Sequence, residues 1–132
     1  MAHKVVNYNV TKTVGPNCAN QPDDVLLVRF LLRRCNQAPT VKGPYTNLPL
    51  HTGFDNELGE AIRHFQKLLV SRGRPCSVDG KVSRAPKGDG FYTINLLYAT
   101  YCNHFTTYKG HIESDPECPR ALAGLEEWAG YL

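Results

Sequence analysis

The chain has 132 residues, the length of one domain, and its 42% hydrophobic and 20% charged residues are typical of a globular protein and exclude a disordered one. Its net charge of +3 is too small and too scattered along the chain to indicate a nucleic-acid interface. No apolar run reaches the roughly 18 residues that a membrane span requires, so we expect no membrane-spanning segment.

The N-terminal stretch and the cysteine count bear on where the protein is made. Residues 1–7 lack the apolar stretch of a signal peptide. We therefore expect synthesis in the cytoplasm, and either retention there or delivery to the periplasm by a route that reads no cleavable signal. An odd number of cysteines favours reduced thiols, although four of the five could pair in an oxidising compartment. The five are Cys18, Cys35, Cys76, Cys102 and Cys118.

An extended arm is the first predicted element. Val6, Tyr8 and Val10 alternate with polar residues, and Val14 returns to the same face. This period of two predicts a half-buried strand or an extended arm within residues 1–19.

The first helix is expected to begin near Pro22 and to run to about Cys35. Asn20 is a suitable capping residue, and a proline is tolerated in the first helical turn. Apolar residues then recur at helical spacing on more than one face, so we expect this helix to be central. Residues 36–54 follow as a loop that is long for a compact domain.

The second helix is predicted over residues 55–71, where apolar residues recur every three or four positions. Asp79-Gly80 then predicts a tight turn within residues 77–82. Residues 83–90 form a second loop, and a third helix is expected over residues 92–105.

A last helix is expected in the C-terminal extension, residues 106–132, opening at Asp115 or at Cys118-Pro119. Its apolar stripe comprises Leu122, Leu125, Trp128, Ala129 and Leu132. We expect Trp128 to dock this helix on the rest of one mainly α domain.

The first two helices share an internal repeat, with apolar residues at i, i+3 and i+7 and a polar residue after the second of them. The segment Val25-x-x-Val28-Arg29-x-x-Leu32 matches Ile62-x-x-Phe65-Gln66-x-x-Leu69.

With its surroundings, this repeat resembles the peptidoglycan-binding domain family. Asp24-Val25-x-x-Val28-Arg29-x-x-Leu32 resembles the family's first helix, in which the polar position is usually Gln. Ala61-Ile62-x-x-Phe65-Gln66 resembles its Ala-Val-x-x-Phe-Gln signature, Val78-Asp79-Gly80-Lys81-Val82 its Val-Asp-Gly-x-Val turn, and Thr93-x-x-Leu96-Leu97 the start of its third helix. The resemblance implies a three-helix core within residues 20–105 and a non-catalytic module that holds cell-wall glycopeptide.

The lead-in to the first helix narrows the resemblance. Val14-Gly15 followed by residues 20–25 looks like the variant that accompanies bacterial type VI secretion effectors and related phage-like machines. The chain departs from the family at Ser83, where Gly is usual, and at Leu58, where Thr is usual. Seven residues are also inserted between Asp79 and the third helix.

A glycopeptide offers sugar hydroxyls, amides and carboxylates, so its site needs an aromatic surface, polar partners and a basic residue. The two long loops and the start of the third helix supply the candidates Tyr45, His51, Thr52, Arg84, Lys87, Tyr92 and Asn95. We interpret Phe65 as a core residue, Gln66 as a side chain that bonds a neighbouring backbone, and Asp79 and Gly80 as turn formers.

Two other classes of function stay open beside the binding module. A protein-interaction adaptor would use the same helices to dock an effector, toxin or tail protein. A small Cys/His hydrolase would need a thiol beside an imidazole, but Cys102 and His104 lie two apart on a helix and point to different faces. The densest group of possible metal ligands, Cys102, His104, His111 and Cys118, matches no common zinc pattern. We therefore predict no enzyme, no metal and no cofactor.

Overall fold

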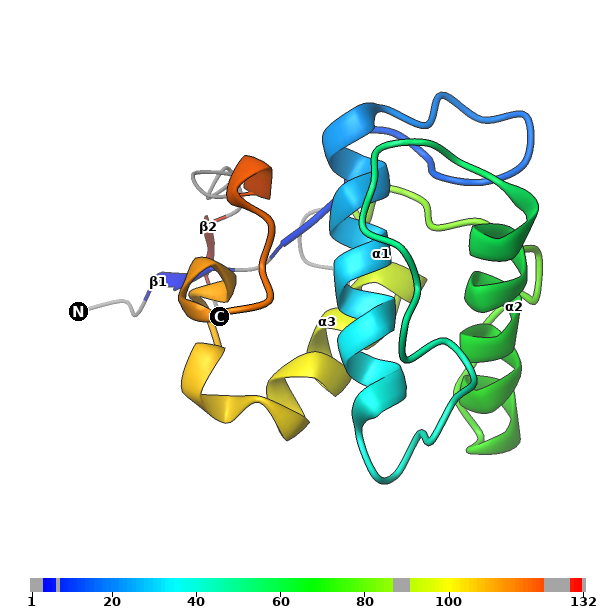
Figure 1. Cartoon of the computed structure of the whole chain (residues 1–132). Coiled ribbons are helices and arrows are strands. Elements are labelled where there is room, and N and C mark those ends of the chain that lie inside the picture. Colours follow the sequence, from blue (N-terminus) through cyan, green and yellow to red (C-terminus); the bar gives the residue numbers. More distant parts are fainter. Residues whose placement is uncertain (1–3, 7, 87–90, 123–128, 132) are drawn as a thin grey trace.

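The computed structural model describes residues 4–6, 8–86, 91–122 and 129–131, and it is mainly helical, as predicted (Figure 1). Its three α-helices are α1 (Pro22–Gln37), α2 (Asn56–Ser71) and α3 (Thr93–His104). All three begin and end within two residues of the predicted bounds. Hydrophobic periodicity therefore located these three helices.

Helix α1 is the centre of the molecule. Figure 1 shows it between α2 on one side and α3 on the other, and eleven of its 16 residues are buried. Phe30 is fully enclosed, and its ring packs against that of Tyr101 in α3, with 5.7 Å between the ring centres. The wide apolar surface of this helix is thus buried on two sides, which contributes most to a single core.

The helix caps differ in how well the sequence indicated them. Asp55 caps α2, since its carboxylate accepts the Leu58 N–H at 2.9 Å. The predicted cap of α1 is wrong, because Gln21 occupies that position and makes no side-chain cap bond. Asn20 has a φ of +49° and bonds both backbone groups of Gly15 instead. An Asn tolerates this left-handed backbone and here closes a loop.

The N-terminal segment lies in extended contact with distant parts of the chain. Strand β1 (Lys4–Val6) pairs antiparallel with β2 (Ala129–Tyr131). Farther along, Tyr8, Val10 and Val14 are buried, and Val14 exchanges two backbone hydrogen bonds with Val82.

The C-terminal extension differs from the predicted helix. Its described residues form β2 and three 3-10 turns, Thr106–Tyr108, Ile112–Ser114 and Arg120–Leu122. The prediction is therefore wrong at Leu122 and at Ala129, while Leu125, Trp128 and Leu132 lie outside the described residues. Residues 129–131 pair with β1, more than 120 positions away, and periodicity carries no information on such a partner.

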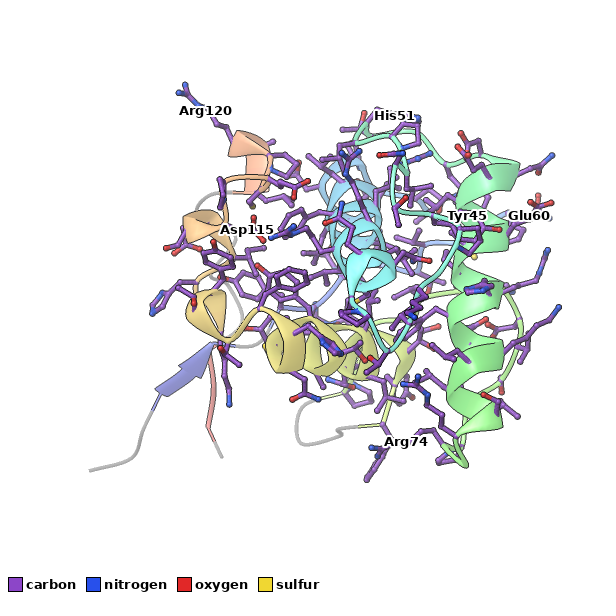
Figure 2. The ribbon with its side chains drawn as sticks, turned by 60° about the horizontal axis from the view of Figure 1, so that its bottom comes forward. Tyr45, His51, Glu60, Arg74, Asp115 and Arg120 are labelled. Atoms are coloured by element: carbon purple, nitrogen blue, oxygen red, sulfur yellow. The ribbon has the colours of Figure 1, made fainter. Side chains whose placement is uncertain are left out.

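A buried carboxylate joins this extension to the helices. The side chain of Asp115 is fully buried; it accepts hydrogen bonds from Arg34 Nε and from the Tyr101 hydroxyl, both at 2.9 Å. Arg34 in turn lies 4.0 Å over the Phe105 ring. Figure 2 shows Asp115 between the C-terminal turns and the helices. Sequence reasoning missed this anchor because its members are far apart in the chain.

Candidate functional site

The described part of the chain contains a small pocket between the turn that follows α2 and the beginning of α3. Its volume is about 230 Å³. It is lined by Pro75, Cys76, Ser77, Asp79, Lys81, Ser83, Phe91, Tyr92 and Thr93. These residues supply two aromatic rings, four hydroxyls, one thiol, one carboxylate and one ammonium group.

One buried amide, that of Gln66 on α2, holds both walls of this pocket. Its Nε2 lies 3.0 Å from Asp79 Oδ1, 2.9 Å from the Lys81 carbonyl and 3.2 Å from the Thr93 hydroxyl. Its Oε1 accepts the Gly80 N–H at 2.9 Å. Gln66 is fully buried; as the sequence predicted, it bonds neighbouring backbone groups, and Phe65 beside it is in the core. The amide therefore fixes the turn and the first residue of α3 relative to each other.

The turn itself requires glycine at position 80. Gly80 has a φ of +72°, in the left-handed region that other residues rarely adopt. A Cβ at this position would lie 3.1 Å from Nε of Arg63. On the far side of the turn, Val82 pairs with Val14 of the N-terminal segment. The predicted Asp-Gly turn is thus held by α2 and by the arm, which makes this pocket wall rigid.

The equivalent position of the repeat, Arg29 on α1, holds the long loop 36–54 in the same way. Its guanidinium is fully buried, donating to the Gly53 carbonyl at 2.7 and 3.2 Å and to the Pro49 carbonyl at 3.0 Å. It also lies 3.2 Å from Asp55. The Leu58 N–H, and after it Arg29, hold the pKa of Asp55 below its ordinary value.

Of the six predicted ligand contacts that the structure describes, Tyr92 alone lines the pocket. Asn95 caps α3, since its side-chain oxygen accepts the Tyr92 N–H at 3.2 Å. Arg84 is exposed and donates to the Val10 carbonyl, and Lys87 lies outside the described residues.

The other three candidates belong to the long loop, and they line a different part of the surface. The Tyr45 ring packs edge-on against His64 of α2, with 5.7 Å between ring centres, and Figure 2 shows it near Glu60. Burial, helped by nearby acidic residues of α2, raises the pKa of Tyr45. His51 and Thr52 are exposed, and His51 Nδ1 accepts the Gly53 N–H. The three candidates of the long loop therefore do not line the pocket beside α3.

The pocket residues that sequence reasoning missed lie next to residues that it used. Lys81 is the variable position of the Val-Asp-Gly-x-Val turn, and Phe91 precedes Tyr92 in the inserted stretch. The sequence did offer one signal for Lys81, because a basic residue within a predicted Asp-Gly turn is a candidate for binding an anion. Cys76, Ser77 and Ser83 carried no such signal.

The five thiols are unpaired, and burial shifts the pKa of three of them. Desolvation raises the pKa of Cys35 and Cys102 above the ordinary thiol value, and it raises the pKa of Cys118 to about 11. Of the predicted metal-like group, His104 bonds the Thr40 hydroxyl at 2.8 Å. Within the described ranges, no three His, Cys, Asp or Glu side chains are placed to hold one metal ion.

The helices that the structure describes are all too short or too polar to cross a membrane. Comparisons with models of known protein families, with curated proteins and with solved structures found no match for this chain.

Proposed function

We propose that this protein is a non-catalytic binding module of the peptidoglycan-binding type, and that the pocket beside Gln66 holds cell-wall glycopeptide. One observation carries the proposal. The motifs through which the sequence resembles that family come together in space, because Gln66 binds the Asp79–Lys81 turn and Thr93 at once.

The chemistry of the pocket fits such a ligand. Phe91 is 64% exposed and, with Tyr92, offers aromatic surface on which a sugar ring can stack. Ser77 and Ser83 provide hydroxyls for sugar hydroxyls and amides, and the Lys81 side chain provides a cation for a carboxylate. The pocket is smaller than the usual range for whole drug-sized ligands, so one unit of a longer chain fits it best.

Three thiols of raised pKa and the pocket carboxylate favour a binding role over catalysis. A nucleophilic cysteine needs a lowered pKa, whereas burial raises that of Cys35, Cys102 and Cys118. In the pocket, the Asp79 carboxylate accepts hydrogen bonds from Gln66 and from the Lys81 N–H, which commits it to holding the turn.

An adaptor that docks another protein is the second candidate function. Exposed apolar side chains favour it, since Val78 and Val70 are about as exposed as the pocket aromatics. A protein partner would contact these exposed valines, whereas a glycopeptide would contact the pocket.

Co-sedimentation with purified peptidoglycan sacculi tests the proposal, in about 150 mM salt to suppress loose charge attraction. We expect saturable pelleting that Phe91→Ala and Tyr92→Ala each weaken, because both remove stacking surface from the pocket. Val70→Ala is the matched control, since Val70 is exposed but does not line the pocket. Absence of pelleting by the folded protein would reject the wall ligand, and equal losses in all three variants would reject the pocket.

A further inference from the structure

Positive charge is concentrated in the segment that builds the pocket. Residues 61–86 contain six Lys and Arg and a single acid, Asp79, which gives a net charge of +5. The whole chain has a net charge of +3, so the remaining residues sum to −2. The modest net charge of the protein therefore conceals a strongly basic region.

Two of these cations contact the pocket or the turn that forms its wall, and two more, Lys67 and Arg74, lie close to them along the chain. Lys81 lines the pocket, and Arg63 lies against Gly80 of the turn. Lys67 is one helical turn beyond Arg63 on α2, hence on the same helix face. Arg74 directly precedes the lining residue Pro75, and Figure 2 shows its side chain extending away from the end of α2.

These charges are not neutralised within the described part of the protein. Arg63, Lys67, Arg74 and Lys81 are all exposed, and none of them belongs to an ion pair there. The one acid in the segment, Asp79, faces the Gln66 amide and the Lys81 N–H. Of the acidic residues of α2, Glu60 lies one helical turn before Arg63 on the same helix face, but no ion pair joins the two side chains. The region is thus available to an external anion.

From this geometry we propose that the ligand is an anionic glycan: a chain of sugar units that carry regularly spaced carboxylate or phosphodiester groups. One unit enters the pocket against Phe91 and Tyr92, and Lys81 meets its charge. The neighbouring charged units meet Arg63 and Lys67 on one side of the turn and Arg74 near Pro75. This inference rests on the proposed function, and it adds that charge, as well as the sugar, is recognised.

The energetics require several charges rather than one. A single exposed ion pair contributes little, because water and salt screen it. The contributions of several ion pairs along one glycan chain add up. Each pair releases counterions from the glycan on binding, so the affinity falls steeply as the salt concentration rises. A neutral glycan forms no ion pairs with these cations, so only its contacts in the small pocket contribute to its binding.

The test is a set of calorimetric titrations of the full chain at low and at physiological salt. The probes are polygalacturonate (carboxylates), purified wall teichoic acid (phosphodiesters), dextran (uncharged) and double-stranded DNA. We expect one or both anionic glycans to bind, dextran not to bind, and DNA to bind more weakly than the better glycan. The ratio of the affinities for the two anionic glycans then shows whether carboxylates or phosphodiesters are recognised.

Matched charge variants locate the binding. Arg63→Gln combined with Lys67→Gln should weaken glycan binding about tenfold and flatten its salt dependence. Lys12→Gln combined with Lys109→Gln removes the same charge from exposed positions elsewhere and should change little. Equal losses in the two pairs would overturn the proposal, as would dextran binding as tightly as the charged polymers or DNA binding best. Pelleting with sacculi despite failure to bind either anionic glycan would overturn this inference and leave the proposed function standing.

Discussion

Two buried polar side chains occupy equivalent positions in α1 and α2 and do the same work with different chemistry. Arg29 donates to the carbonyls of Gly53 and Pro49 and pairs with Asp55, whereas Gln66 satisfies both ends of the Asp79–Lys81 turn with a neutral amide. The charged side chain fixes a long loop by its donors alone. The amide also accepts, which lets one side chain hold a turn and a helix start together.

The two halves of the repeat differ in what their buried polar side chain holds in place. Around Arg29 the loop residues are fixed, but they leave their polar candidates dispersed over the surface. Around Gln66 the walls converge on a pocket. We therefore expect changes at Arg29 to affect stability, and changes at Gln66 to affect both stability and binding.

The largest effect is expected in the core beside these two positions. Phe65→Ala should lower the free energy of unfolding by roughly 3–5 kcal/mol, because it deletes a buried aromatic ring. Val28→Ala, its counterpart in the repeat, removes fewer atoms and should cost less. Urea denaturation measures both. A cost below about 1 kcal/mol for Phe65→Ala would show that α2 is misplaced.

Replacing Arg29 or Gln66 by Met tests directly whether the two side chains act independently. We expect Arg29→Met to cost about 3 kcal/mol and Gln66→Met about 2 kcal/mol, since hydrogen bonds from a charged donor are stronger. Hydrogen exchange separates their roles: the Gly80 amide, which donates to Gln66, should exchange faster only in Gln66→Met. Faster exchange at Gly80 in Arg29→Met as well would mean that the two halves are not independent.

The smallest effect concerns the partner of Arg29. Hydrogen bonding by the Leu58 N–H and the charge of Arg29 lower the pKa of Asp55 from 3.8. A depressed folded-state pKa means that ionised Asp55 stabilises the protein above about pH 4 and that this stability is lost as the pH falls through the folded-state pKa. Because its side chain is 46% exposed, the contribution should stay below about 1 kcal/mol.

Asp55→Asn keeps a capping oxygen but cannot titrate, so it isolates this effect. The difference in urea midpoint between the two proteins should shrink as the pH falls below 4. A difference that is constant with pH would show that Asp55 acts only as a cap.

The sequence predicted what depends on neighbouring residues. The bounds of α1, α2 and α3 followed from periodicity, and the roles of Phe65, Gln66 and Gly80 followed from two short motifs. What it could not predict depends on distant partners. Residues 129–131 pair with β1, and Asp115 is anchored by Arg34.

The candidate site shows the same division. Tyr92 was found because it directly precedes α3, next to a recognisable motif. Tyr45 and His51 were grouped with it because all lie in or beside long loops, yet Arg29 and His64 hold those two residues elsewhere. The composition of a loop indicates which functional groups it carries, but the helix residues that hold the loop determine where those groups lie on the surface.

Cys76 offers the most direct test of the pocket as the ligand site, because its thiol lines the pocket. Cys18 is also half-buried but belongs to the lead-in to α1, where its thiol contacts the Pro16 carbonyl. The measurement is the rate of iodoacetamide labelling of both thiols, followed by mass spectrometry, with and without saturating soluble peptidoglycan fragments. We expect the fragments to slow labelling of Cys76 several-fold and to leave Cys18 unchanged. An unchanged rate at Cys76 would contradict the assignment of the pocket as the binding site.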